Sequence, residues 1–494
     1  MAKVILDGSH LSLDHAQMIA KGAQVQIHNS VKNPIEASSR FVSRVSTGEK
    51  PVYGINTGFG YLARHKIGKS KLKELQNNIL KSHAGGYGNP LSVEETRLAM
   101  TLRLNVLLKG LTGVTYPLCE ALANLINAHI YPLIPEYGSV GASGDLAPLA
   151  HLVLPLIGHG KVRYRGQVIG ARAALKRAGL KPYQLQIKEG LSLINGTQIM
   201  LSVGTLALTE ALKIVELADW VACLTYEAMI GNIDALNPLI HQARGQTGQI
   251  YSAEAMRQHL EGSYLYDEET KRTRVQDPYS MRCAPQIHGP SRDALSHAKG
   301  IIIKELNATT DNPLVFEDSL EIISGGNFHG QCLAFAFDIA SMAIAELGNV
   351  SERRLELLLN PHFSELPAFL TPFEGTCSGY MTAQYLSASL VNENKLLANP
   401  ACTDSIPGNV GVEDHVSMGM TSARKFKKII KNTRVILAAE LVAAAQGVDL
   451  REVKKLGRGT SVLYRRLRRE VPDLKNDRVI AKDIEKAVNI LEDL

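Results

Sequence analysis

Residues 191–230 are apolar and rich in Ala and Leu, with only sparse charged interruptions such as Glu210, Lys213 and Glu216. This pattern predicts a helix much longer than the average of about 10–14 residues. So few charges over so many turns indicate burial on most sides, either inside a bundle of helices or at a subunit interface. We therefore expect a fold organised around long packed helices.

Helical periodicity recurs elsewhere, whereas strand signals are short and weak. Apolar spacing typical of helices occurs at residues 13–22, 33–47, 69–83, 92–129, 335–359 and 434–447. A small hairpin is predicted for residues 161–164 with 168–169. The expected fold is mainly α, with a long-helix bundle core and a smaller mixed N-terminal part. We expect that part to span residues 1–190 and the long-helix core with the C-terminal helices to span 191–494, packed intimately as one unit.

The charge and cysteine content exclude several classes of protein. The 494 residues carry 54 basic and 48 acidic side chains, and the net charge of +6 is too mild to indicate a nucleic-acid-binding protein. Basic clusters within residues 424–434 and 465–469 are interpreted as solvated helix faces. The six cysteines are scattered without a CxxC pair, so neither a disulfide framework nor a metal site is expected.

Targeting and membrane signals are also weak. The apolar run at residues 146–157 is broken by Pro148, His151 and Pro155, and the short N-terminal run ends at Asp7. A membrane span needs about 20 apolar residues, and a signal peptide needs a longer apolar core than this. We therefore expect a soluble cytoplasmic protein with no nucleic-acid or membrane partner.

A glycine-rich run at residues 138–151 contains Ala142-Ser143-Gly144, flanked by Gly141 and Asp145. One interpretation is a loop that enters a helix, with Ser143 or Asp145 as its N-cap. The other uses the tolerance of glycine for strained backbone. If the Gly144 nitrogen attacks the Ala142 carbonyl carbon and two waters leave, the tripeptide becomes a methylidene-imidazolone ring. The former Ser143 Cβ is then an electrophile, which proteins normally obtain from a cofactor.

The whole run resembles the signature of the ammonia-lyase and aminomutase family, which includes the histidine, phenylalanine and tyrosine ammonia-lyases. Matching motifs follow in chain order from Tyr53 to Glu413, so the resemblance covers most of the chain. It implies a 4-methylidene-imidazol-5-one (MIO) cofactor formed from Ala142, Ser143 and Gly144. It also implies a homotetramer with a central bundle of helices, whose active sites combine residues from different subunits.

The resemblance assigns the roles that elimination of ammonia from an amino acid requires. Tyr53, in a loop that resembles the family's Tyr-Gly-x-Asn-Thr-Gly motif, would abstract the β-proton. Its ordinary pKa of about 10 means that the phenolate must be stabilised. Arg282 would hold the substrate carboxylate with its planar fork. Tyr279 would act beside it in catalysis, and Gln276 would line the same site.

Two further positions complete the expected site. Asn195, in the segment 193–197, is interpreted as an N-cap at the start of the long helix. By resemblance it would also hydrogen-bond the ring or the substrate carboxylate. Phe328, in the glycine-rich segment 324–330, would pack near the ring.

His83 and Glu413 bear on which amino acid is bound. The pair Ser82-His83 and the run that begins at Glu413 both resemble histidine ammonia-lyases, whereas aromatic enzymes usually have Phe-Leu or His-Leu at the first site and glutamine at the second. A carboxylate accepts an imidazole N–H, but against a phenyl ring it would be desolvated without a partner. The resemblance therefore implies elimination from L-histidine to give urocanate.

Two departures keep alternatives open. Histidine enzymes generally have glutamine where this chain has Val412, and the preceding segment 405–411 also differs from the family pattern. Ser-His also occurs in some tyrosine aminomutases, so a tyrosine ammonia-lyase or tyrosine 2,3-aminomutase is the alternative, with His83 facing a tyrosine hydroxyl. A remoter alternative is an inactive helical scaffold, against which the intact motifs argue.

Overall fold

The computed structural model describes residues 2–494, which group into two compact units. The first unit comprises residues up to 206 together with 299–338 and 400–424. The second comprises residues 207–298, 339–399 and 425–494. These units follow spatial packing and alternate along the chain, whereas the division expected at residue 190 follows sequence pattern. That division stays a prediction.

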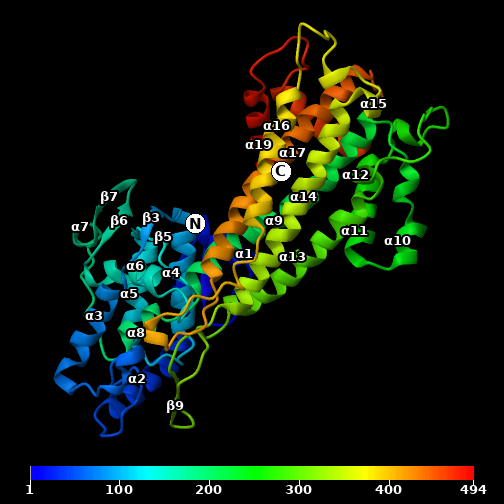
Figure 1. Cartoon of the computed structure of the whole chain (residues 1–494). Coiled ribbons are helices and arrows are strands. Elements are labelled where there is room, and N and C mark those ends of the chain that lie inside the picture. Colours follow the sequence, from blue (N-terminus) through cyan, green and yellow to red (C-terminus); the bar gives the residue numbers. More distant parts are fainter. Residues whose placement is uncertain (1) are drawn as a thin grey trace. The chain divides into compact units, whose positions relative to one another are not determined.

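The fold is mainly α, as the sequence predicts (Figure 1). Four long helices contribute residues to both units: α9 (Gln198–Ala228), α13 (Ala284–Leu306), α14 (Gln331–Leu359) and α17 (Gly419–Leu450). The expected continuous helix over 191–230 is wrong in one respect, because α8 (Glu189–Ile194) ends before α9 begins. The helices predicted at 335–359 and 434–447 are present and extend further toward the N-terminus.

By length and composition alone, α9 and α14 could cross a membrane. The broken apolar run at residues 146–157 gave no such indication. Buried residues make up 72% of the most apolar window of α9 and 61% of that of α14. Core helices of folded proteins pass the same test of length and hydropathy.

The first unit contains shorter helices, of which α4 is almost wholly buried. Its helices are α1 (Leu13–Ala20), α2 (Lys32–Ser46), α3 (Leu72–His83), α4 (Val93–Leu107), α5 (Tyr116–Asn127), α6 (Leu146–Val153), α7 (Ala171–Arg177) and α8. Single 3-10 turns include η2 (Gly60–Arg64), η4 (Leu154–Ile157) and η8 (Asn409–Gly411). A capping box in which Ser92 and Glu95 exchange hydrogen bonds starts α4.

This unit also contains small β-sheets. Three are two-stranded: β1 (Lys3–Leu6) with β2 (Gln24–Ile27), β3 (Tyr87–Pro90) with β5 (Pro135–Tyr137), and β8 (Leu314–Phe316) with β9 (Glu321–Ile323). The fourth has three strands, in the order β4 (Tyr131–Pro132), β6 (Lys161–Tyr164) and β7 (Gln167–Gly170). The β6–β7 pair confirms the predicted hairpin, with Tyr164 opposite Gln167.

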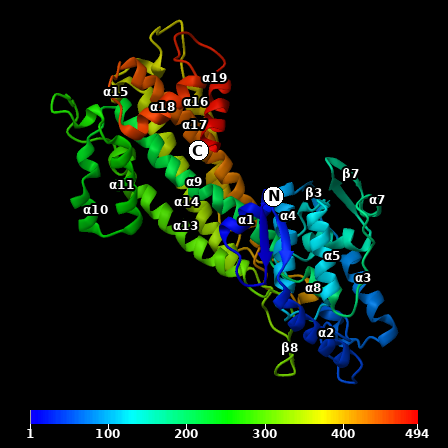
Figure 2. The ribbon, with the colours of Figure 1, turned by 180° about the vertical axis from the view of Figure 1, so that it is seen from behind.

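The second unit is helical in its regular structure. It contains parts of the long helices with α10 (Pro238–Arg244), α11 (Thr247–Leu260), α12 (Tyr279–Arg282), α15 (Pro361–Ser364), α16 (Met381–Leu397), α18 (Arg458–Glu470) and α19 (Ile480–Glu492). Figures 1 and 2 show the second-unit parts of α9, α14 and α17 side by side.

Buried polar groups tie these three helices together. Arg354 on α14 donates two hydrogen bonds to Glu440 on α17, of 2.5 and 2.9 Å, and both side chains are fully buried. Thr225 on α9 donates to the same carboxylate at 2.7 Å. A buried carboxylate needs such partners, and removing one of a buried ion pair typically costs about 3–5 kcal/mol. The network therefore fixes how the helices of this unit pack.

Candidate active site

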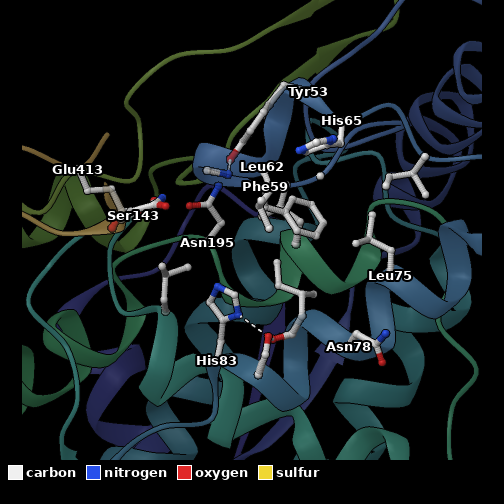
Figure 3. A pocket seen from close by; sticks show the side chains of 18 residues that line it. Tyr53, Phe59, Leu62, His65, Leu75, Asn78, His83, Ser143, Asn195 and Glu413 are labelled. Carbon is white, nitrogen blue, oxygen red and sulfur yellow. Dashed lines mark hydrogen bonds between the residues drawn. The ribbon is translucent and has the colours of Figure 1, made fainter. Parts of the chain in front are cut away.

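A cavity of about 620 Å³ opens within the first unit (Figure 3). Figure 3 shows Ser143 beside Glu413, with Tyr53, Asn195 and His83 directed into the same space. These five residues come from five separate segments of the chain. The volume lies within the range of about 300–1,000 Å³ typical of small-molecule sites. The structure thus brings together five of the residues that the sequence motifs single out.

The loop that carries Tyr53 is held by its own side chains. Asn56, which is buried, accepts from the Val52 N–H at 2.7 Å and donates to the Lys50 carbonyl at 3.1 Å. Gly54 has a φ of +72°, which favours glycine, and a Cβ there would also approach the Leu191 side chain to 2.6 Å. This turn directs the Tyr53 side chain into the cavity.

Tyr53 receives a hydrogen bond from the Gly60 N–H, at 3.4 Å from the phenol oxygen. Burial raises the pKa of Tyr53 above its ordinary value, and the Gly60 hydrogen bond opposes that rise. A proton acceptor at this position therefore depends on donors such as Gly60 to stabilise the phenolate.

The tripeptide Ala142-Ser143-Gly144 folds back on itself before α6. Gly141 and Gly144 form an antiparallel bridge, and Ser143 has a φ of +50°. Gly144 lies so close to the Gly196 carbonyl that a Cβ would approach its oxygen to 2.1 Å. A Cβ cannot be accommodated there, so the sequence requires glycine at position 144.

Asp145 follows the tripeptide but does not act as the side-chain cap that the sequence suggests for its own helix. It occupies the N-cap position of α6 without a side-chain capping bond. Its buried carboxylate instead accepts from the N–H groups of Ile199 and Met200, at 3.0 and 2.8 Å, in the first turn of α9. Ser139 adds a third bond at 2.8 Å. Burial raises the pKa of Asp145 to about 6. The tripeptide is thereby tied to the start of α9.

Asn195 is not the N-cap of the long helix, because it ends α8 as the C-cap residue. Arg103 on α4 explains the break, since its buried guanidinium donates to the Asn195 carbonyl at 3.0 Å and to the Gln198 side chain at 2.8 Å. The Asn195 side chain donates to the Asn312 carbonyl at 3.0 Å. Its Oδ1 is buried and has no hydrogen-bond partner among the described residues. This acceptor is available to a donor that enters the cavity.

Glu413 accepts from the Ser143 hydroxyl at 3.4 Å and from the Asn409 amide at 3.3 Å. His83, the last residue of α3, makes a 3.0 Å hydrogen bond with Ser82 through its Nδ1. Burial lowers the pKa of His83 below its ordinary value, which favours the neutral imidazole. The cavity thus combines a carboxylate acceptor with a neutral ring that has one nitrogen available.

The second unit carries the other expected residues. Tyr279 and Arg282 lie on the short helix α12, where the Arg282 guanidinium stacks 4.5 Å from the centre of the Tyr279 ring. Arg282 also donates to the Asp277 carbonyl at 3.0 Å. Tyr279 is 69% exposed and Gln276 is also exposed. Tyr226 anchors this helix by donating to the Met281 carbonyl at 2.8 Å.

Phe328 lies half-buried in its loop and does not line the cavity. No Lys or Arg is present among the lining residues, all of which are described. Within residues 2–494, no three His, Cys, Asp or Glu side chains are placed to hold a metal ion. A substrate carboxylate in this cavity would therefore need a cation from elsewhere.

The sequence profile of the aromatic amino acid lyase family matches residues 11–469. A histidine ammonia-lyase of Shouchella clausii (strain KSM-K16) is 48% identical over 483 residues, which cover 98% of this chain and 96% of that protein. The chain belongs to the aromatic amino acid lyase family. It is a carbon–nitrogen lyase, as the motifs predict.

Two solved structures have folds that closely resemble this chain. The crystal structure of histidine ammonia-lyase from Trypanosoma cruzi matches with a TM-score of 0.91 and 40% identity, over 99% of this chain and 93% of that one. The structure of tyrosine aminomutase from Streptomyces globisporus matches with a TM-score of 0.94 and 37% identity, over 100% and 97%. Both likenesses extend over the whole fold of the lyase.

Two contributors to the lyase cavity were not predicted. Gly60 donates to Tyr53, and Asn409 contacts Glu413. Segment 405–411 stood out only as a departure from the family pattern, and nothing in its residue types indicated a place in the cavity. Both contacts are local, over seven and four residues, but they lie in irregular turns where no helix or strand period marks a functional position.

Proposed function

We propose that this lyase eliminates ammonia from L-histidine to give urocanate. The observation that carries the proposal is the presence of Glu413 and His83 in the same cavity as Tyr53 and Ser143. A carboxylate acceptor suits an imidazole N–H, and a second imidazole suits the other ring nitrogen. A phenyl side chain would desolvate both groups and offer neither of them a hydrogen bond.

We infer that Ala142, Ser143 and Gly144 form the MIO group. The folded-back tripeptide, with its bridge between Gly141 and Gly144, fits the ring closure. The unpartnered Asn195 Oδ1 in the same cavity fits a site that receives a further polar group. When formed, the ring supplies an electrophile at the former Ser143 Cβ that makes the substrate amine a better leaving group.

The residues of the chain then have separate tasks. Glu413 accepts the imidazole N–H and fixes the orientation of the side chain. Tyr53, as the phenolate, takes the β-proton, while the Gly60 N–H stabilises its charge. Loss of the proton from Cβ and of ammonia from Cα leaves the double bond of the acrylate. Asn195 orients the substrate through its amide.

The substrate carboxylate is assigned to Arg282, with Tyr279 and Gln276 beside it. Because the lining of the first-unit cavity holds no Lys or Arg, we propose that Arg282 of another subunit completes each site in a homotetramer. Exposed Phe335 and Met342 on α14 and exposed Leu396 on α16 support such an assembly. We further propose that the enzyme is cytoplasmic and has neither membrane nor nucleic-acid partners, and that Phe328 packs beside the ring.

L-Tyrosine remains the alternative substrate, favoured by the likeness to tyrosine aminomutase and by Val412. The test is a panel in which the purified protein meets L-histidine, L-tyrosine or L-phenylalanine, and the ultraviolet absorbance of the acrylate is followed. A rise with histidine that is absent in Ser143→Ala is expected. A rise with tyrosine alone, accompanied by a β-amino acid, would overturn the histidine assignment in favour of an aminomutase.

A further inference from the structure

Asn409 lies between Glu413 and the loop that carries Tyr53. Its Nδ2 donates to Glu413 Oε1 at 3.3 Å, and its Oδ1 accepts from the Tyr61 N–H at 3.3 Å. The neighbouring peptide donates the Gly60 N–H to the Tyr53 oxygen. One side-chain amide thus contacts both Glu413, which we propose recognises the substrate, and the backbone turn that supports Tyr53.

The contact with the base loop is close. Gly60 has a φ of +53°, and a Cβ there would come within 2.1 Å of the Asn409 Nδ2. A side chain at position 60 would displace the amide, so glycine is required for this approach. The Asn409 side chain packs directly against the Gly60 backbone, and this contact sets the distance between the two loops.

The loop that presents Asn409 is strained. Asn409 and Val410 have φ values of +49° and +54°, which is unfavourable for a β-branched residue in particular. Backbone bonds between Gly408 and Glu413, of 2.8 and 3.3 Å, close the loop around them. Such strain persists where surrounding contacts hold it, and it concentrates at ligand-binding sites.

We propose that Asn409 is a positioning residue that couples substrate recognition to proton abstraction. Its amide nitrogen fixes the Glu413 carboxylate, and its amide oxygen fixes the turn that supports Tyr53. This role rests on the proposed lyase reaction. It accounts for asparagine, since only a side chain with a donor and an acceptor, and with tolerance of positive φ, makes both contacts.

The first test separates the two contacts. Asn409→Asp keeps an acceptor for Tyr61 N–H but places a second carboxylate against Glu413. We expect the KM for L-histidine to rise about tenfold at neutral pH, with kcat changed less, because recognition is damaged and the turn is kept.

The second test uses a matched pair of glycine variants. Asn409→Gly removes both contacts while relieving backbone strain, and we expect kcat to fall and KM to rise, each about fivefold. Val410→Gly relieves the same kind of strain at the next position, where the side chain is 80% exposed and outside the cavity lining. It should retain wild-type kcat and KM. Equal losses in the two variants would mean that loop flexibility is the cause and would overturn the inference.

A double-mutant cycle tests the contact with Glu413 directly. In Glu413→Gln the new amide donates to an aspartate at position 409, so Asn409→Asp should cost less there than in the wild-type background. The same fold-loss in both backgrounds would contradict the coupling. Wild-type turnover is measured alongside, on whichever panel amino acid it deaminates. A wild type that is inactive on all three amino acids would overturn the proposed function and this role together. An active wild type with equal losses in the two glycine variants would overturn this role alone.

Discussion

Replacement of Asp145 probes how the tripeptide that we propose to form the ring is held. The carboxylate is fully buried and accepts three hydrogen bonds, from Ser139 and from the N–H groups of Ile199 and Met200. In Asp145→Ala all three donors lose their acceptor away from water. In Asp145→Asn a side-chain carbonyl remains to serve the start of α9.

The magnitude follows from those contacts. Loss of an N-cap costs about 0.5–2 kcal/mol, and each further buried donor left without a partner costs about 1–3 kcal/mol. The charge acts in the opposite direction near neutral pH, because burial raises the pKa of Asp145 to about 6. We therefore expect Asp145→Ala to lower the free energy of unfolding by about 3 kcal/mol. Asp145→Asn should lower it by less than about 1 kcal/mol.

The raised pKa adds a dependence on pH. The unfolded carboxyl loses its proton near pH 3.8, whereas the folded one keeps it until about pH 6. The stability from this group is therefore fully present below 3.8 and is lost as pH rises through about 6. Asparagine does not titrate, so the stability of wild type relative to Asp145→Asn should fall across that window.

Urea unfolding followed by circular dichroism measures the stability, and intact mass spectrometry measures ring formation as the loss of two waters. We expect a smaller cyclised fraction in Asp145→Ala and a wild-type fraction in Asp145→Asn. Ser139→Ala, which removes one of the three bonds, is the matched control and should cost about 1 kcal/mol. Wild-type stability and complete ring formation in Asp145→Ala would refute the anchoring role.

Three further outcomes are expected. Tyr53→Phe should lower kcat by about 10²–10⁴ and leave substrate affinity nearly intact, and wild-type turnover in this variant would show that Tyr53 is not the base. Glu413→Gln should raise the KM for L-histidine more than for L-tyrosine or L-phenylalanine, and an equal effect on all three would exclude a reading role. Tyr53→Phe mixed with Arg282→Lys, after dissociation and reassembly, should regain part of the activity because some mixed sites hold both native residues. No recovery in verified mixed oligomers would contradict shared sites.

Much of the fold could be predicted because burial leaves a periodic trace. The apolar stretch after residue 197 and those of α14 and α17 became long helices, and the hairpin of β6 and β7 formed as expected. The break between α8 and α9 was missed because its cause lies on another helix. Arg103, distant in sequence, bonds to the backbone and side chains of that turn.

Some features of the site could likewise be predicted from the sequence, and others could not. Tyr53, Ser143, His83, Asn195 and Glu413 were predicted because each lies in a motif that matches the family, and the cavity contains all five. The cap supplied by Asp145 and the bridge through Asn409 were not predictable, since each joins a side chain to the backbone of a remote segment. Such contacts depend on three-dimensional placement and not on local residue pattern.

The charge distribution of the cavity has a consequence for how activity depends on assembly. Its lining offers Glu413 as an anion and no Lys or Arg, so the substrate carboxylate would enter a partly buried site with no permanent opposite charge. Burying an unpaired carboxylate is costly, and the neutral His83 offsets little of that cost. Arg282, half-buried beside the exposed ring of Tyr279 on α12, is the cation assigned to this task. If another subunit supplies Arg282, dissociation of the oligomer removes the cation that pairs with the substrate carboxylate. Tyr53 and the tripeptide stay in place. Dilution should then raise KM without loss of the proposed ring from the intact mass, since the Asp145 contacts that hold the tripeptide lie within the first unit.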